Sequence, residues 1–342
     1  MNLLDNEIYA SDIQKILSTF DITPFNRKKI LITGGAGLIG ASIADLFLYA
    51  MKASLINADI FIADLNKESF SKKFGSEKNI TFIPFDALSS FTWEQPFDYV
   101  IMAAGIASPQ KYVKLPVETA WTSINGVMSF LPLFKKQIGK YIYISSSEVY
   151  EDSLEPHVED EPTRVITSDL RFSYAFGKIA TEQFCQYAYH EYGSHISIAR
   201  PGHIFGPRAN EQDTRVSSAF CRDVSLGRDI TLKSDGASLR SYCYSLDCAV
   251  AILTILLRGK PGDIYNVGTS EKTTILELAK MISSSGKVSL LHEKPLATEE
   301  RAFNPAHNSS LNVEKLYDIG FQHCFTVQEG IDHNIKIWRG GR

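Results

Sequence analysis

The sequence predicts an α/β protein with a doubly wound parallel sheet and a smaller α/β lobe towards the C-terminus. Two observations predict this fold class. From residue 28 onward, short apolar strand patterns alternate with helical patterns, which is typical of a parallel sheet covered by helices on both faces. After Arg200 the alternation gives way to irregular segments punctuated by proline and glycine, which indicates a second, smaller lobe.

The chain is predicted to divide into three parts. Residues 1–27 form an N-terminal extension in which apolar residues recur near helical spacing, so we expect a short amphipathic helix there. Residues 28–199 hold the strand–helix alternation, and residues 200–342 form the smaller lobe. Within that lobe, residues 243–258 are expected to return to the main sheet as an apolar helix.

The composition excludes several classes of function. Of the 342 residues, 44% are hydrophobic and 22% are charged, which provides enough apolar material for a buried core. A net charge of −4, with scattered lysines and arginines, argues against a nucleic-acid partner. Because no apolar run approaches the length of a membrane span and no signal peptide is recognisable, we expect no membrane association.

The cysteines and histidines indicate neither disulfides nor a metal site. The five cysteines are odd in number and lack the CxxC spacing of metal-binding or redox pairs. They are interpreted as reduced thiols of a cytoplasmic protein. The eight histidines show no metal-ligand spacing, so no metal is expected.

A glycine-rich turn follows the first predicted strand. The apolar run Ile30–Thr33 leads into three glycines at three-residue spacing, and a helical pattern begins at once. The first glycine allows a backbone conformation closed to other residues, the second lets the main chain approach a pyrophosphate, and the third lets the helix pack close to the strand. The helix N-terminus offers free N–H groups to the phosphates. The predicted dinucleotide-binding residues of this turn are Gly34, Gly37, Leu38, Ile39 and Gly40.

Two acidic residues follow the next two strands. The second strand, Asp59–Ala63, ends at Asp64, whose carboxylate can accept both hydroxyls of an adenosine ribose and would repel a 2′-phosphate. NAD is therefore favoured over NADP. The third strand, Ile80–Pro84, is followed by Asp86, which either holds the adenine or forms a turn.

Small residues end the fourth strand, Tyr99–Ala103, and there Ala103 and Ala104 would let a cofactor lie close to the backbone. The remaining elements expected in this part are the helix Pro116–Phe134, which contains Asn125, and the strands Tyr141–Ser145 and Ile196–Ala199.

A tyrosine and a lysine four residues apart carry the chemical signal. Tyr174 and Lys178 open a helical pattern, so they lie one turn apart on the same face. An ammonium beside a phenol stabilises the phenolate, and lowering the pKa of a tyrosine from about 10 to neutrality takes roughly 4 kcal/mol. Lys178 and a positively charged nicotinamide could share that stabilisation. The product is a general base that takes a hydroxyl proton while a hydride leaves the same carbon. At the end of the fifth strand, Ser146 can donate a hydrogen bond to the substrate oxygen.

Together, the turn Gly34–Gly40, Ser146, Tyr174 and Lys178 resemble the extended short-chain dehydrogenase/reductase family of nucleotide-sugar epimerases and dehydratases. The resemblance runs from about residue 28 to residue 338. It implies a Rossmann domain with tightly bound NAD, a C-terminal lobe that binds a nucleoside-diphosphate sugar, and oxidation of the sugar at C4. Tyr174 would be the base, Lys178 would lower its pKa and hold the nicotinamide ribose, and Ser146 would steady the C4 oxygen.

Within the family, the motifs look most like those of the UDP-glucuronate decarboxylases. The resemblance rests on Ala107–Pro109 with Tyr112, on Ser146–Glu148 and on Asp213–Ser218. In that group the 4-keto acid loses CO₂, because the new carbonyl accepts the electron pair. Glu148 would lie near C5 and C6 of the sugar, and guanidinium groups would pair with the diphosphate or a carboxylate. The substrate-binding candidates are Ser108, Asn125, Ser147, His203, Arg215, Arg240 and Arg301.

Several departures leave the reaction open. Glu155–Phe172 does not match the segment of the decarboxylases before the tyrosine, and His203 stands where the family usually has asparagine. His203 is either a neutral hydrogen-bonding replacement or a proton-transfer group. Ser147 takes the place of the aspartate usual in 4,6-dehydratases of the glucose type, although Glu148 can still serve as a base.

Alternative functions therefore stay open. A nucleotide-sugar 4-epimerase and a 4,6-dehydratase use the same first step, and a non-catalytic NAD-binding scaffold or sensor would use the fold alone. A homodimer is also expected: the helices Pro116–Phe134 and Tyr174–Tyr189 carry large apolar residues, and in the family this pair forms a dimeric four-helix bundle.

Overall fold

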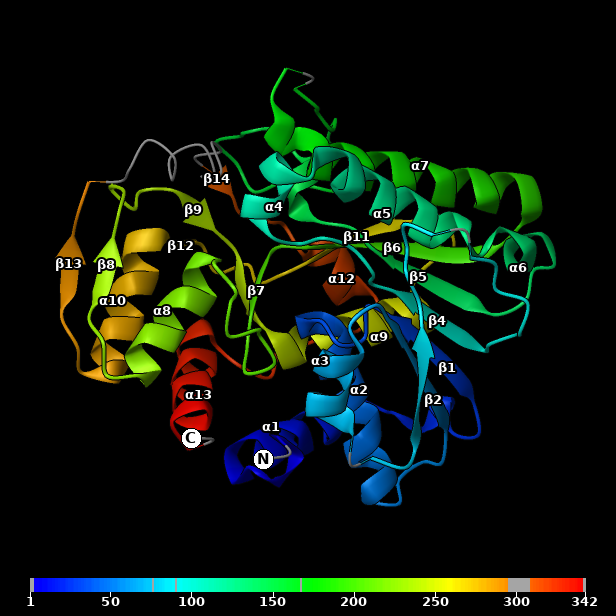
Figure 1. Cartoon of the computed structure of the whole chain (residues 1–342), viewed down its shortest axis with the longest axis horizontal. Coiled ribbons are helices and arrows are strands. Elements are labelled where there is room, and N and C mark those ends of the chain that lie inside the picture. The colour runs from blue at the N-terminus through cyan, green and yellow to red at the C-terminus, as the bar shows by residue number, and fades with distance from the viewer. Residues whose placement is uncertain (1–2, 76, 90, 167, 295–307, 341–342) are drawn as a thin grey trace.

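The computed structural model describes residues 3–75, 77–89, 91–166, 168–294 and 308–340. Its centre is a seven-stranded sheet in the order β11-β6-β5-β4-β1-β2-β3, in which all neighbouring strands are parallel (Figure 1). The strands are β1 (Lys29–Thr33), β2 (Asp59–Asp64), β3 (Ile80–Pro84), β4 (Tyr99–Met102), β5 (Lys140–Ile144), β6 (His195–Pro201) and β11 (Ile264–Val267).

The predicted fold class is confirmed, with one strand more than expected. The first six strands lie where the sequence predicts them. The seventh, β11, comes from the part of the chain assigned to the smaller lobe and pairs with β6 at the sheet edge. The strand order reverses between β1 and β4, and such a switch point opens a crevice for ligands at the carboxyl ends of the strands.

Helices cover both faces of the sheet. Helices α5 (Pro116–Met128) and α7 (Ser173–Tyr192) lie on one face, and α2 (Leu38–Lys52) and α9 (Ser245–Arg258) lie on the other (Figure 1). Because successive strand residues point to opposite faces, β1 contributes Ile30 and Ile32 to one hydrophobic core and Leu31 to the other. Burial on both faces explains why the strands read as continuous apolar runs.

The single helix expected over Pro116–Phe134 is wrong. Helix α5 ends at Met128, and a separate short helix, α6 (Leu131–Lys135), follows. Pro132 has no N–H to donate to the carbonyl of Met128, and its ring would clash with that carbonyl in a continuous helix. The chain therefore turns at Ser129 and begins again.

The smaller lobe lies beside the carboxyl ends of the strands. Three helices pack together in it: α8 (Val216–Ser225), α10 (Ile275–Gly286) and α13 (Val327–Gly340). Short strand pairs and one three-stranded sheet complete it. These strands are β7 (His203–Phe205), β8 (Ile230–Leu232), β9 (Leu239–Arg240), β10 (Tyr242–Tyr244), β12 (Thr273–Thr274), β13 (Leu290–His292) and β14 (Asn308–Ser309).

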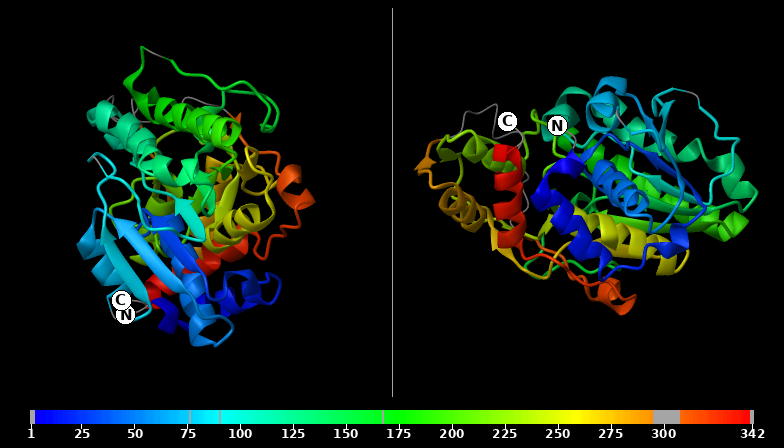
Figure 2. Two further views of the ribbon diagram at one scale, coloured as in Figure 1. Left: turned by 90° about the vertical axis from the view of Figure 1, so that its right-hand side faces the viewer. Right: turned by 90° about the horizontal axis from the view of Figure 1, so that it is seen from below.

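The N-terminal extension joins the two parts of the molecule. Its helix, α1 (Glu7–Leu17), packs against α2, α9 and α13 (Figures 1 and 2). The hydroxyl of Tyr9 donates to Asp45 of α2 at 2.8 Å, and Asp12 accepts from the hydroxyl of Tyr244 at 3.0 Å. In the described part of the chain, no helix has the length and apolar character needed to cross a membrane.

Candidate active site

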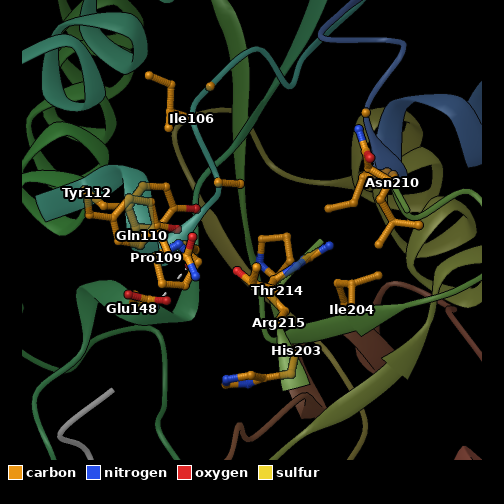
Figure 3. Close-up of a pocket in the computed structure, with 18 of the residues that line it drawn as sticks. Ile106, Pro109, Gln110, Tyr112, Glu148, His203, Ile204, Asn210, Thr214 and Arg215 are labelled. Carbon is orange, nitrogen blue, oxygen red and sulfur yellow. Dashed lines mark hydrogen bonds between the residues drawn. The ribbon is translucent and has the colours of Figure 1, made fainter. Parts of the chain in front are cut away.

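A cleft of about 1420 Å³ lies at the carboxyl ends of the strands and extends into the smaller lobe. Figure 3 shows Tyr112, Gln110 and Glu148 on one side of it and His203, Thr214 and Arg215 on the other. Most of the residues predicted for cofactor, catalysis and substrate line this cleft. They are Gly34, Gly37, Leu38, Ile39, Gly40, Asp64, Asp86, Ala103, Ala104, Ser146, Ser147, Glu148, Tyr174, Lys178, His203, Arg215 and Arg240.

The glycine turn has a conformation that requires glycine. Gly34 has a φ of +66°, and a Cβ there would lie 2.7 Å from the carbonyl oxygen of Ala103. A Cβ on Gly40 would lie 2.7 Å from the Cα of Gly35. Gly37 caps α2, so the open N–H groups of this helix face the cleft. Gly34 and Gly40 thus allow the turn to pack closely against its neighbours, and the N-terminus of α2 is left facing the cleft, where a phosphate group can bind.

The end of β2 fits the adenosine half of NAD. Asp64 lies beside the turn, and its Oδ2 accepts a hydrogen bond from the backbone N–H of Ala36 at 3.0 Å. Its other oxygen accepts from the N–H of Asn66 at 2.9 Å. An ionised carboxylate has about four acceptor sites, so Asp64 retains capacity for ribose hydroxyls. The residues present therefore fit a dinucleotide without a 2′-phosphate.

Asp86 lines the cleft and also forms a turn, so both of its predicted alternatives have a structural basis. Its Oδ1 accepts from the N–H of Leu88 at 2.9 Å, and its Oδ2 accepts from the hydroxyl of Ser89 at 3.0 Å. Any contact of Asp86 with the adenine would come from the lone pairs that these bonds leave.

The serine, tyrosine and lysine predicted to act together meet between the end of β5 and the start of α7. Ser146 hydrogen-bonds the phenol of Tyr174, and both residues are buried. The ammonium of Lys178 donates to the carbonyl oxygen of Ile144 at 2.7 Å and lies 5.6 Å from the centre of the Tyr174 ring. A hydroxyl donor, a phenol and an ammonium thus share one wall of the cleft.

The surroundings of Tyr174 by themselves raise its pKa. Burial and the nearby Glu148 raise this pKa to about 12, against weaker lowering by Ser146, Arg215 and Tyr112. Lys178 is not among the groups that lower the pKa of Tyr174, and burial lowers the pKa of Lys178 itself to about 8. A positively charged nicotinamide near the phenol would supply the missing stabilisation of the phenolate.

Two side chains of the site were not among the predicted site residues. Tyr112, in α4 (Pro109–Lys114), stacks on Tyr174 with ring centres 4.5 Å apart and an angle of 6°. Buried Arg171 lies 3.1 Å from Glu148, with its Cζ 6.0 Å from the centre of the Tyr112 ring. The only sequence signals are that Arg171 lies three residues before the tyrosine and that Tyr112 belongs to a motif of the decarboxylases.

The opposite wall is cationic and surrounds a histidine. Arg215 forms a two-pronged ion pair with Asp213, with Nε 3.0 Å and Nη2 2.5 Å from Oδ2. Arg240 donates to the carbonyl oxygen of Leu239. Burial, followed by the charges of Arg240, Arg215 and Arg171, lowers the pKa of His203 to about 3. His203 is therefore neutral near pH 7, which favours the hydrogen-bonding role over proton transfer.

Three substrate-binding candidates do not join this group. Ser108 precedes α4 and does not line the cleft; its carbonyl oxygen accepts from Lys111 and Tyr112. Asn125 also lies outside the cleft lining, and its amide donates to the carbonyl oxygens of Ala87 and Ser89, so it holds the loop after β3. Its polar group is used within the protein. Arg301 lies outside the described residues.

The sequence matches a known family and several characterised enzymes. Residues 30–268 match the NAD dependent epimerase/dehydratase family. The chain is 31% identical over 258 residues to UDP-glucuronic acid decarboxylase 6 of Arabidopsis thaliana, covering 74% of this chain and 73% of that protein. It is 26% identical over 326 residues to dTDP-D-glucose 4,6-dehydratase of Bos taurus, covering 91% of this chain and 89% of that protein.

Among solved structures, UDP-glucose 4-epimerase of Thermus thermophilus in complex with NAD superposes with a TM-score of 0.76. The match covers 92% of this chain and 100% of that chain, at 24% sequence identity. At this identity the likeness concerns the fold.

Proposed function

Because the chain belongs to the NAD-dependent epimerase/dehydratase family, we propose that it modifies a nucleotide sugar by oxidising the sugar at C4 and decarboxylating the resulting 4-keto acid. The observation that carries the proposal is the meeting of Ser146, Tyr174 and Lys178 beside the glycine turn, opposite an arginine-rich wall. The glycine turn and Asp64 would hold NAD, which would supply a hydride acceptor for C4 and a hydride donor to the product.

The wall of the cleft that carries Ser146, Tyr174 and Lys178 supplies proton transfer and orients the substrate. The phenolate of Tyr174 takes the proton of the C4 hydroxyl, so that the carbon that loses the hydride becomes a ketone. Ser146 donates to the C4 oxygen and holds it against Tyr174. Lys178, anchored on the carbonyl of Ile144, places a positive charge near the phenol. Stacking with Tyr112 fixes the plane of the Tyr174 ring.

The arginines support a substrate with several negative charges. Arg215 and Arg240 lie on the side of the smaller lobe, and Arg171 lies beside Glu148 on the other side. A nucleoside-diphosphate uronate brings two phosphates and a carboxylate, and guanidinium groups bind both kinds of anion through paired hydrogen bonds. The cleft therefore suits an acidic sugar.

The site favours decarboxylation over dehydration. Loss of CO₂ needs no base at C5, because the electron pair of the C5–C6 bond moves towards the new C4 carbonyl. Dehydration needs a base at C5 and an acid at C6. Glu148 is engaged by Arg171 at 3.1 Å, and Ser147 takes the place of the aspartate that would donate the proton.

Product masses test the proposal. Purified protein is mixed with UDP-, GDP-, CDP- and dTDP-sugars, UDP-glucuronate included, and the products are weighed by mass spectrometry. We expect loss of CO₂ from UDP-glucuronate, and Tyr174→Phe should slow this turnover by roughly 10²- to 10⁴-fold, as removal of a general base does. Loss of water would instead indicate dehydration. A product of unchanged mass that contains a different sugar would indicate epimerisation. NAD binding without turnover on any sugar would favour a scaffold or sensor.

We also propose that the protein is a homodimer. Large apolar side chains stay exposed on the outer sides of α5 and α7, including Val117 (75% exposed), Trp121 (49%) and Tyr187 (57%). Large apolar side chains that stay exposed on two neighbouring helices are typical of a protein–protein contact, so a second copy that covers them is the expected partner.

The five cysteines are free thiols, which supports a cytoplasmic location.

A further inference from the structure

Segment 206–210, which follows β7, is attached both to α2 of the main domain and to α13 of the smaller lobe. The guanidinium of Arg208 forms a two-pronged ion pair with Asp45 of α2, at 2.7 and 2.6 Å, and both side chains are buried. The carbonyl oxygen of Pro207 accepts from the indole of Trp338 in α13 at 3.0 Å. The segment then reaches Asn210, which lines the cleft (Figure 3).

A lysine outside the cleft connects this segment to the glycine turn. Lys73, near the end of α3 (Lys67–Phe74), donates from one ammonium to the carbonyl oxygen of Ala36 at 2.8 Å and to that of Arg208 at 3.0 Å. Ala36 lies inside the turn, and its N–H is bound by Asp64. The next residue of α3, Phe74, lies under the Arg208 guanidinium, 5.2 Å from ring centre to Cζ.

Burial disfavours the charged form of Lys73. The pKa of Lys73 is lowered to about 8, first by burial and then by the charge of Arg208, against the opposing charges of Asp45 and Asp64. An ammonium in such a place is disfavoured unless its hydrogen bonds compensate. Its two carbonyl acceptors, those of Ala36 in the turn and Arg208 in segment 206–210, are 172 residues apart in sequence.

We infer that Lys73 is a positioning residue for the cofactor: it ties segment 206–210 to the glycine turn and so keeps NAD from leaving between catalytic cycles. The inference depends on NAD binding but not on which sugar is bound. On this inference, a cofactor whose phosphates lie on the turn is released when the turn and segment 206–210 move apart, and the shared ammonium opposes that movement. Tight retention suits an enzyme that returns the hydride within one cycle.

The test compares two neighbouring lysines of α3. Lys73→Met removes the bridge, and Lys72→Met is the matched control, because Lys72 is 73% exposed and pairs with Glu68 on the surface at 2.8 Å. Each protein is loaded with radiolabelled NAD, chased with excess unlabelled NAD, and followed by filtration. We expect K73M to release label roughly tenfold faster or more, since hydrogen bonds from a charged donor are worth about that factor. K72M should match the wild type, and K73R should restore slow release.

Equal release from K73M and the wild type overturns the inference, while a wild type that holds no NAD overturns the cofactor assignment itself. Should K73M fail to fold, hydrogen exchange of the wild type decides. Removing NAD should speed exchange of amides in residues 34–40 and in segment 206–210 together. Faster exchange in 34–40 alone would show that the two segments are not coupled, and would also overturn the inference.

Discussion

At the scale of the single residue, Lys178 combines a catalytic position with an unfavourable environment. Its ammonium is buried, and the carbonyl of Ile144 is its hydrogen-bond acceptor. Burial disfavours the charged form, which is why its pKa lies at about 8 and not near 10.5. Placing a charge beside Tyr174 therefore costs stability at neutral pH.

This cost predicts a pH-dependent stability difference. Between pH 8 and 10.5 the unfolded chain binds more protons at Lys178 than the folded chain, so this residue's contribution to stability rises with pH. The free energy of unfolding of the wild type minus that of Lys178→Met should therefore rise by up to roughly 3 kcal/mol from pH 7 to pH 10.5. Urea denaturation without added cofactor at both pH values measures it.

The control for this measurement is Lys72→Met, which removes an exposed lysine of α3. Its difference from the wild type should change little over the same range. A wild type that loses stability relative to K178M as the pH rises would contradict the burial argument.

At the scale of the element, the strand–turn–helix unit β1–α2 depends on one backbone conformation. Two glycines have nearly the same left-handed φ but different surroundings: Gly34 has +66° and Gly227, between α8 and β8, has +71°. Comparing them distinguishes the energetic cost of the backbone conformation from the cost of steric overlap. A Cβ on Gly34 would meet the backbone of Ala103 and Ala104 at 2.7–2.8 Å, whereas a Cβ on Gly227 would meet nothing within 4 Å.

We therefore predict unequal effects for two matched substitutions. Gly227→Ala should lower the free energy of unfolding by about 1 kcal/mol, the ordinary penalty of a left-handed conformation. Gly34→Ala should lower it by roughly 3 kcal/mol or more, because backbone must shift as well, and NAD binding should be lost. Denaturation curves and calorimetric titration with NAD check both effects. Similar costs and retained NAD binding in both variants would refute the packing argument.

At the scale of the whole molecule, the exposed apolar residues of α5 and α7 predict the state of association. Replacing Trp121 with glutamate puts a charge into the proposed contact between two copies, and burying an unpaired charge is strongly unfavourable. Light scattering at low concentration should find a dimer for the wild type and a monomer for W121E.

The matched control is Leu291→Glu, because Leu291 is 44% exposed on β13 of the smaller lobe, away from both helices (Figure 1). This variant should stay dimeric. Light scattering that finds a monomer for the wild type would contradict the proposed homodimer.

Local patterns were sufficient for much of the fold. Strands such as β2 and β3 were predicted within a residue of their observed bounds, because alternation between strand and helix and the residues at the ends of strands are short-range signals. The break at Pro132 was also readable from the sequence but was missed. The glycine spacing and the four-residue spacing of Tyr174 and Lys178 likewise depend on neighbours along the chain.

By itself the sequence determined the first six strands of the sheet, the glycine turn and the places of Ser146, Tyr174 and Lys178 along the chain. Only the tertiary structure decided the pairing of Arg171 with Glu148, the use of Asn125 as a loop support and the bridge from Lys73 to segment 206–210. The physical reason is the range of the interactions. Spacing along the chain encodes contacts within one turn or strand, whereas these contacts join elements that meet only when the sheet and the smaller lobe have packed together.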